Sequence, residues 1–271
     1  MLDFLQLPAR EPKPRQTGLT HVLDKGLGIR QMQDLLETGG EFIDILKLGW
    51  GTGYVTRNLA DKVAAYQKAG IPVCFGGTLL EVAIAQGKFD EYCRMVRRLG
   101  LTHVEFSSGV LEMEIEKKLD YVRKLAQDFV VLAEVGSKDV NAVVAPFRWV
   151  EEIKALSQAG AWKVIAEARE SGTVGLYRRT GEVRSGLVDE IVANVSPEHL
   201  IFEAPQKHQQ VWFLKQFGPS VNLGNIAPDE VIPLETLRLG LRGDTMPDFQ
   251  LQTWKPRPVS SMPTNNSTTE P

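Results

Sequence analysis

Four glutamates lie near the ends of short apolar runs in this sequence: Glu105, Glu134, Glu167 and Glu203. A strand that is buried on both faces rarely carries a charge, so these residues need a chemical reason. Carboxylates that converge in one place repel each other unless cations lie among them. An all-carboxylate set suits a hard ion such as Mg²⁺, and the sequence has no His/Cys spacing typical of zinc. We therefore predict that Glu134, Glu167 and Glu203 contribute to a Mg²⁺ site and that Glu105 is a catalytic group.

An alternative stays open for all four carboxylates. Each glutamate could pair with a neighbouring Lys or Arg and only stabilise the fold. Cations are indeed predicted close by: Lys47 lies in the middle of an apolar strand, Arg169 follows Glu167 by two positions, and Lys25 ends the first strand. Positive charges beside carboxylates indicate an anionic substrate bound around a metal. Lys25 could equally be a surface loop residue.

Glycine-rich turns follow several of the predicted strands, at Gly49–Thr52, Gly76–Thr78 and Gly224–Asn225. Glycines let backbone N–H groups approach a phosphate closely, although glycine in such a turn often serves backbone conformation alone. Lys207 begins a predicted helix, whose N-terminal N–H groups also favour phosphate. Arg242 follows the last helical stretch and could either contact the same phosphate or close the end of the barrel.

The elements that must position these residues alternate along the chain, as in a parallel sheet built from βαβ units. About eight strands are predicted, the number that closes a (β/α)₈ TIM-type barrel, whose active site forms at the carboxyl ends of its strands. An open doubly wound sheet is disfavoured because no G-x-G-x-x-G follows an early strand. The predicted strands are Thr20–Lys25, Phe42–Leu48, Pro72–Gly76, His103–Ser107, Phe129–Val135, Trp162–Ala168, His199–Ala204 and Val221–Leu223. The predicted helices are Arg30–Thr38, Leu59–Ala69, Leu79–Leu99, Ile115–Gln127, Trp149–Ala159, Gly186–Asn194, Lys207–Phe217 and Asp229–Leu241.

Composition is compatible with one large core, because the 271 residues are 43% hydrophobic. We expect a flexible arm at residues 1–16, a barrel over 17–249 and a disordered tail over 250–271. The net charge of −3 gives no basic field for nucleic acid, and no apolar run is long enough to span a membrane. The two cysteines, Cys74 and Cys93, form no close pair, and no signal peptide is recognisable. We expect a soluble, cytoplasmic homo-oligomer.

A series of motifs in order along residues 17–246 resembles the phosphosulfolactate synthase family. The motifs are Val22-Leu23-Asp24-Lys25-Gly26, Lys47-Leu48-Gly49-Trp50-Gly51-Thr52, Gly76-Gly77-Thr78-Leu79, Glu134-Val135-Gly136, Glu167-Ala168-Arg169-Glu170-Ser171-Gly172, Phe202-Glu203-Ala204-Pro205-Gln206-Lys207, Ser220-Val221-Asn222-Leu223 and Gly240-Leu241-Arg242-Gly243-Asp244-Thr245.

The resemblance implies a (β/α)₈ barrel that adds sulfite to phosphoenolpyruvate with the help of Mg²⁺, giving (2R)-phospho-3-sulfolactate for coenzyme M or sulfolactate synthesis. It also implies that Lys138 protonates C2 of the substrate, with Lys25 as the next candidate. A general acid needs a pKa nearer neutrality than that of a free lysine, and partial burial beside other cations would lower it. The segment Ser137–Asn141 departs from the lysine-rich version of the archaeal enzymes. The candidate substrate- or phosphate-binding residues are Lys47, Trp50, Gly51, Gly76, Gly77, Arg169, Ser171, Lys207, Asn222, Asn225 and Arg242.

Two other functions remain open from the sequence. One is a noncatalytic barrel that acts as a stress-associated or phospholigand-binding protein, as in a related plant heat-stress family. That family lacks much of the Arg-Glu-Ser-Gly and Pro-Gln-Lys chemistry retained here. The other is a Mg²⁺-dependent lyase or aldolase that acts on a different enolpyruvate or keto acid.

Overall fold

Eight parallel strands form the centre of the protein in a computed structural model, which describes residues 4–136 and 144–251. The strands follow the order β3-β2-β1-β8-β7-β6-β5-β4, and β3 also lies against β4, so the ring is nearly closed. This confirms the predicted (β/α)₈ barrel. The strands are β1 (Thr20–Asp24), β2 (Ile45–Leu48), β3 (Val73–Phe75), β4 (His103–Phe106), β5 (Val130–Val135), β6 (Ala161–Ala166), β7 (Leu200–Glu203) and β8 (Leu223–Ile226).

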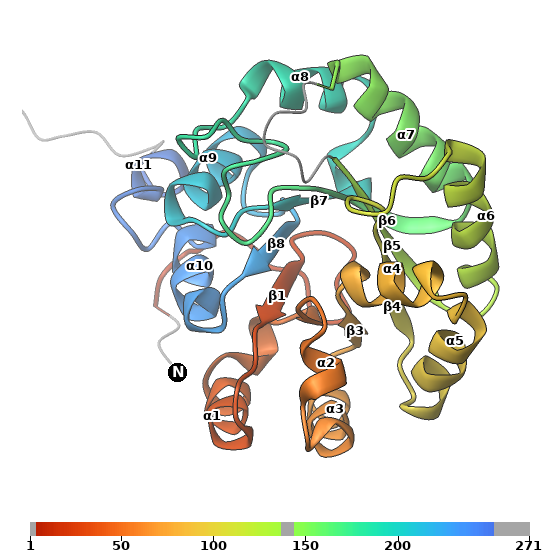
Figure 1. Ribbon diagram of the computed structural model, residues 1–271. Helices are drawn as coiled ribbons and strands as arrows, with labels where there is room; N and C mark the ends of the chain where they lie inside the picture. Colours follow the sequence, from red (N-terminus) through yellow and green to blue (C-terminus); the bar gives the residue numbers. More distant parts are fainter. Residues whose placement is uncertain (1–3, 137–143, 252–271) are drawn as a thin grey trace, which may run out of the picture.

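Helices surround the strands on the outside of the ring (Figure 1). They are α1 (Ile29–Gly39), α2 (Thr52–Val55), α3 (Leu59–Lys68), α4 (Gly77–Ala85), α5 (Phe89–Arg98), α6 (Ile115–Leu125), α7 (Pro146–Gln158), α8 (Ser185–Asn194), α9 (Lys207–Phe217), α10 (Val231–Arg238) and α11 (Met246–Phe249). Short 3₁₀ turns occupy Gly40–Phe42, Pro197–His199 and Pro228–Glu230. Within the described ranges, no helix is long and apolar enough to cross a membrane.

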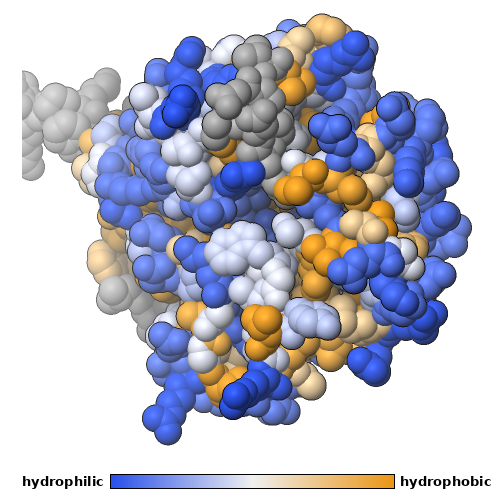
Figure 2. Space-filling view, viewed as in Figure 1, coloured by the Kyte–Doolittle hydropathy of each residue, from blue (hydrophilic) through white to orange (hydrophobic). Residues whose placement is uncertain are grey.

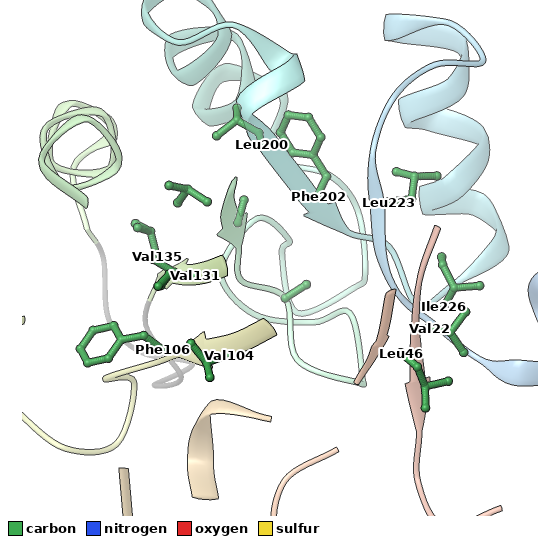
Figure 3. Packing of buried hydrophobic residues seen from close by; sticks show 14 of the residues in the cluster. Val22, Leu46, Val104, Phe106, Val131, Val135, Leu200, Phe202, Leu223 and Ile226 are labelled. Carbon is green, nitrogen blue, oxygen red and sulfur yellow. The ribbon is translucent and has the colours of Figure 1, made fainter. Parts of the chain in front are cut away.

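The main hydrophobic core lies between the strands and the helices. Alternate strand side chains point outward into it, and Figure 3 shows Leu200 and Phe202 of β7 directed toward the neighbouring helix. The side chains of β1 and β8, Val22 and Ile226, meet in the same shell. The opposite strand face forms a smaller core inside the ring, consisting of Leu19, Ile45, Cys74, Leu132, Ile165 and Ile201. Both faces of every strand are therefore buried, as a barrel requires.

Most predicted elements are found with shifted boundaries, and two differences change the arrangement of the elements. The single helix expected over Leu79–Leu99 is two helices, α4 and α5, because Gly87 between them adopts a left-handed φ of 66°. The last strand lies at Leu223–Ile226 rather than Val221–Leu223. Its register with β1 shifts, since Thr20 and Val22 are two residues apart whereas their partners Leu223 and Ile226 are three apart. This is a β-bulge, which bends a strand and redirects a side chain.

Adjacent strands are joined by parallel hydrogen-bonded ladders at every position in the ring except between β3 and β4, within the part of the chain that the structure describes. Side chains connect the two sides of this seam instead. The backbone N–H of Gly77, just after β3, donates to Glu105 of β4 at 2.7 Å. Glu81 of α4 accepts hydrogen bonds from the N–H groups of Val110 and Leu111, at 2.9 and 3.2 Å. The seam is therefore held by glutamates rather than by a ladder.

The segment that precedes β1 was expected to be a loose arm, but its residues contact the barrel. Arg10 pairs with Glu235 at 2.9 Å and Arg15 pairs with Asp44 at 3.0 Å. Lys13 donates hydrogen bonds to the carbonyls of Gly40 and Ile43. These contacts attach the segment to the side of the barrel where β1 and β2 begin. The predicted C-terminal tail falls almost wholly outside the described residues.

A buried ion pair fixes the loop that follows β1. The Lys62 ammonium lies 2.6 Å from a carboxylate oxygen of Asp24, and the two side chains are 1% and 0% exposed. The other Asp24 oxygen accepts hydrogen bonds from the backbone N–H groups of Gly26 and Leu27. Tyr66 of α3 donates to the same carboxylate at 3.2 Å. Helix α3 is thus connected to the carboxyl end of β1 by a network that water does not reach.

We expect Lys62→Met to destabilise the protein by about 3–5 kcal/mol, because it leaves the buried Asp24 carboxylate without its cation. Lys88→Met is the matched control, since Lys88 pairs with Glu91 at 3.2 Å while both side chains are about half exposed, and an exposed pair contributes less than about 1 kcal/mol. Urea unfolding monitored by circular dichroism measures both changes. Equal, small effects would show that the Asp24 pair contributes little to stability.

Candidate active site

A cavity of about 250 Å³ opens at the carboxyl ends of the strands. This is near the lower end of the roughly 300–1,000 Å³ typical of small-molecule sites, so it suits a small substrate. Figure 2 shows hydrophilic residues around a hollow near the centre of this face. The cavity brings together ten of the predicted site residues: Lys47, Trp50, Gly76, Gly77, Glu105, Glu134, Glu167, Arg169, Glu203 and Asn225.

The ammonium of Lys47 lies inside the ring of carboxylates. It is 3.0 Å from Glu105 and 3.2 Å from Glu203, and its side chain is only 6% exposed. Burial alone would lower the pKa of Lys47, but Glu105, Glu203 and Glu134 together raise it well above its usual range. Lys47 therefore remains charged at neutral pH, and it is a permanent positive charge at the base of the cavity.

One ammonium does not balance the surrounding carboxylates. Burial raises the pKa of Glu203 to about 7, and the nearby charges of Glu134 and Glu105 add to the rise while Lys47 opposes it. Burial and Glu134 likewise raise the pKa of Glu105, against the effect of Lys47. Additional positive charge in the cavity would restore both groups to their ionised forms. The electrostatics of the carboxylate ring therefore favour a bound cation.

The donor atoms fit a hard cation. The cavity is lined by carboxylates and by the side-chain amide of Asn225, whose buried Oδ1 has no hydrogen-bond partner. Oxygen donors of this kind bind Mg²⁺. Glu167 is held in place at the rim, because its Oε1 accepts a 2.6 Å hydrogen bond from the N–H of Arg169. Glu203 is fixed in the same way by the N–H of Ala168 at 2.8 Å. The residues present thus provide a fixed oxygen-rich site.

Backbone strain is concentrated at this cavity. Across the described ranges, the non-glycine residues with positive φ are Trp50 at 49°, Arg169 at 56° and Asn225 at 55°. All three line the cavity. A left-handed conformation is uncommon for residues with a Cβ, and such outliers cluster at functional sites. Asn225 adopts this conformation within the bulge of β8, which explains how its side chain reaches the cavity.

The turn after β3 approaches its neighbours too closely for any side chain. A Cβ on Gly76 would lie 2.8 Å from the backbone nitrogen of Trp50, and one on Gly77 would lie 2.4 Å from the Cβ of Ser107. The absence of side chains lets the start of α4 lie against β4. The N–H groups of the two glycines are used within the protein, because that of Gly76 donates to the carbonyl of Leu48 at 2.8 Å and that of Gly77 donates to Glu105 at 2.7 Å.

Residues 8–244 match the (2R)-phospho-3-sulfolactate synthase (ComA) family. The chain is 42% identical over 249 residues to the phosphosulfolactate synthase of Bacillus subtilis, covering 90% of this chain and 99% of that protein. It is 44% identical over 236 residues to the phosphosulfolactate synthase of Methanocaldococcus jannaschii, covering 85% and 94%. The chain belongs to the phosphosulfolactate synthase family.

Other comparisons are more distant. The protein HEAT-STRESS-ASSOCIATED 32 of Arabidopsis thaliana is 23% identical over 266 residues, covering 87% of this chain and 91% of that protein. A crystal structure of 3-hexulose-6-phosphate synthase has a TM-score of 0.54 at 13% identity, covering 82% and 99% of the two chains. This structural likeness reflects the fold alone. The predicted resemblance to the phosphosulfolactate synthases is confirmed.

Several residues predicted from the family motifs do not line the cavity. Lys25 is exposed, and Ser171 is exposed with its hydroxyl 2.8 Å from that of Thr173. Gly51 has no atom within 4 Å of the position of a Cβ. Lys207 pairs with Asp244 at 2.7 Å. Arg242 also lies near Asp244, at 3.8 Å. Lys138 lies outside the described residues.

Asn222 is placed at the opposite end of the barrel. Its side chain accepts a hydrogen bond from the N–H of Leu19, just before β1, and donates to the carbonyls of Glu198 and Leu200, at the start of β7. It therefore connects strand starts, whereas Asn225 reaches the cavity. The β8 bulge accounts for this difference, and the motif alone does not reveal it.

The cavity is also lined by four residues that the sequence analysis did not select: Leu23, Thr78, Val110 and Glu170. Thr78 and Glu170 each directly follow a selected residue in a family motif. Their position next to Gly77 and Arg169 could therefore have identified them from the sequence. Val110 is 69% exposed beside the cavity. Nothing in its local sequence distinguishes it from an ordinary loop residue.

We expect Gly77→Ala to destabilise the protein by about 1–3 kcal/mol, as for overpacking, because the new methyl group collides with Ser107 and separates α4 from β4. Gly51→Ala is the matched control: it lies in another family motif at an ordinary φ of −99° and meets open space. Its effect should stay within about 0.5 kcal/mol. Chemical denaturation of the two variants checks this difference. Equal stabilities would mean that the turn can move apart without loss.

Proposed function

We propose that this chain catalyses the Mg²⁺-dependent addition of sulfite to C3 of phosphoenolpyruvate, giving (2R)-phospho-3-sulfolactate. The observation that carries the proposal is the identity of 42–44%, over 85–90% of this chain, to proteins named phosphosulfolactate synthase. The cavity is small, carries fixed carboxylates and contains a permanently charged lysine. These features suit a small, multiply charged anion that is bound together with a metal.

The reaction determines what the site has to stabilise. The sulfur lone pair of sulfite forms a bond to C3, the C2–C3 double-bond pair moves toward the substrate carboxylate, and a proton is then added at C2. Negative charge therefore accumulates at the carboxylate end in the transition state. Fixed positive groups directed at that charge lower the barrier because they need no reorganisation during the reaction.

Glu134, Glu167 and Glu203 would hold the Mg²⁺ ion, which supplies Lewis-acid stabilisation of the substrate carboxylate when bound. Lys47 contributes a second positive charge, because the glutamates paired with it keep its side chain protonated. Arg169 lies at the rim in its left-handed conformation and binds an anionic end of the substrate. Together these groups position the substrate and neutralise its charge.

Gly76, Gly77 and Thr78 complete the wall of the cavity, and the Thr78 hydroxyl is a donor that suits a phosphate. Glu105 has a positioning role in this proposal, because it contacts both the Gly77 N–H and Lys47. Lys138, outside the described residues, remains the proposed proton donor to C2.

Both cysteines are free and buried, which is compatible with the proposed cytoplasmic location. The homo-oligomeric state also remains a proposal.

The direct test is consumption of phosphoenolpyruvate by the purified protein. We expect consumption only when sulfite and Mg²⁺ are both present, and we expect phosphosulfolactate as the product by mass spectrometry. Consumption with another nucleophile but not with sulfite would indicate a different lyase or aldolase. Binding of phosphoenolpyruvate without turnover would favour the noncatalytic alternative suggested by the distant plant relative.

A second prediction concerns the metal and does not depend on turnover. We expect Mg²⁺ to raise the melting temperature of the wild type, because a ligand that binds only the folded state stabilises it. Glu134→Gln should abolish this rise. Without Mg²⁺ the variant should have a melting temperature close to that of the wild type, since Glu134 repels Glu105 and Glu203 but attracts Lys47.

Differential scanning fluorimetry with and without Mg²⁺ measures both effects. Glu116→Gln on the exposed surface of α6 is the matched control and should keep the full Mg²⁺ response. A Mg²⁺ response of wild-type size in Glu134→Gln would remove Glu134 from the metal site. A lower melting temperature without Mg²⁺ would instead indicate that Glu134 mainly stabilises the barrel.

A further inference from the structure

Three metal-ligating side chains meet inside the barrel: His21 of β1, Cys74 of β3 and Glu105 of β4. One ligand atom of each lies within 4.8 Å of the other two. The residues are 0%, 0% and 2% exposed. Glu105 lines the cavity, whereas His21 and Cys74 do not. The cluster therefore extends from the cavity into the barrel interior.

His21 is the least satisfied of the three. Neither ring nitrogen has a hydrogen-bond partner, although the ring is completely buried. A neutral imidazole has one donor and one acceptor, and each such group left unpaired in the interior costs about 1–3 kcal/mol. Burial and the charge of Lys47 hold the pKa of His21 well below its usual range, so the ring is neutral. Neutral imidazole is the form that binds metals.

A second polar atom is buried without a hydrogen-bond partner, the hydroxyl of Tyr92 on α5. Burial chiefly raises the pKa of Tyr92, and Cys74 and Glu105 are among the groups that add to the rise. Residue 224 is glycine, and a Cβ there would lie only 3.1 Å from Nδ1 of His21, so a side chain at this position would crowd the imidazole.

We propose that His21, Cys74 and Glu105 form a second metal site, selective for a borderline-soft divalent ion such as Zn²⁺ over Mg²⁺. Nitrogen, sulfur and oxygen donors are the usual zinc set, whereas Mg²⁺ prefers oxygen alone. Zinc bonds of about 2.0–2.3 Å place tetrahedral ligands roughly 3–4 Å apart, so small side-chain rotations suffice to close the site.

Charge balance supports occupancy in the buried interior. Binding converts the Cys74 thiol to a thiolate and releases its proton to solvent. The thiolate and the Glu105 carboxylate together carry the two negative charges that neutralise the divalent ion. Lys47 retains its contact with Glu203 at 3.2 Å. The metal would also connect β3 to β4 across the seam that lacks a ladder.

Cobalt substitution tests the site without any assay of turnover. Added to the metal-free full-length protein, Co²⁺ should produce the charge-transfer absorption of a cobalt–thiolate bond. This absorption should be lost in Cys74→Ser and at least tenfold weaker in His21→Gln. Cys93→Ser is the matched control and should keep the full absorption, because Cys93 is the other free, buried cysteine and lies on the outer helix α5. Zn²⁺ should displace the signal, whereas a large excess of Mg²⁺ should not.

The wild-type measurement can overturn the proposal by itself. If Co²⁺ gives no charge-transfer absorption with the wild type, the cluster does not bind such metals and buried water satisfies the polar atoms instead. Displacement of the signal by Mg²⁺ would also overturn the proposed selectivity. Loss of the signal in Cys93→Ser but not in Cys74→Ser would place the metal elsewhere. If Cys74→Ser fails to fold, protection of the wild-type Cys74 thiol from alkylation by Zn²⁺ is the substitute test: protection supports the site and unchanged alkylation contradicts it.

Discussion

Like-charge repulsion between carboxylates in a space with little water shapes the mouth of this barrel. Glu105 and Glu203 share the Lys47 ammonium, while Glu134 raises the pKa of both carboxyl groups. Removing water strengthens every such interaction, whether attractive or repulsive. The arrangement is therefore not a simple structural ion pair. Its charges balance only when further positive charge enters, and for this reason a metal and an anionic substrate can be accommodated together.

This arrangement is accompanied by conformational strain in the backbone at the rim of the cavity. Trp50 and Arg169 follow β2 and β6, whereas Asn225 lies within β8, yet each adopts a left-handed φ where it meets the cavity. Hydrogen bonds hold the surrounding turns, as when the N–H of Arg169 donates to Glu167. A rigid barrel can maintain strain of this kind because the strand ends are fixed on both faces by packing. Side chains at the rim are thereby positioned before any ligand arrives.

Sequence periodicity was sufficient to predict the barrel and the inward direction of the glutamates. In a parallel sheet, few other arrangements can accommodate an apolar strand with a charge near one end. It was not sufficient for features that depend on tertiary contacts. The choice between Asn222 and Asn225 depends on a bulge that the motif does not encode. The cluster of His21 with Cys74 could not be predicted either, since no spacing along the chain relates residues on non-adjacent strands. The family resemblance identified motifs correctly but did not distinguish cavity residues such as Gly77 from Gly51.

The seam between β3 and β4 has a consequence for the dynamics of the barrel. Most of the ring can open only by breaking ladder hydrogen bonds, whereas this junction depends on the side chains of Glu81 and Glu105. Local opening free energies are lowest where few backbone hydrogen bonds must break. Amide exchange with solvent should therefore be fastest at the facing edges of β3 and β4. Opening at this junction would expose the inward side chains of β3 and β4 to ions and protons.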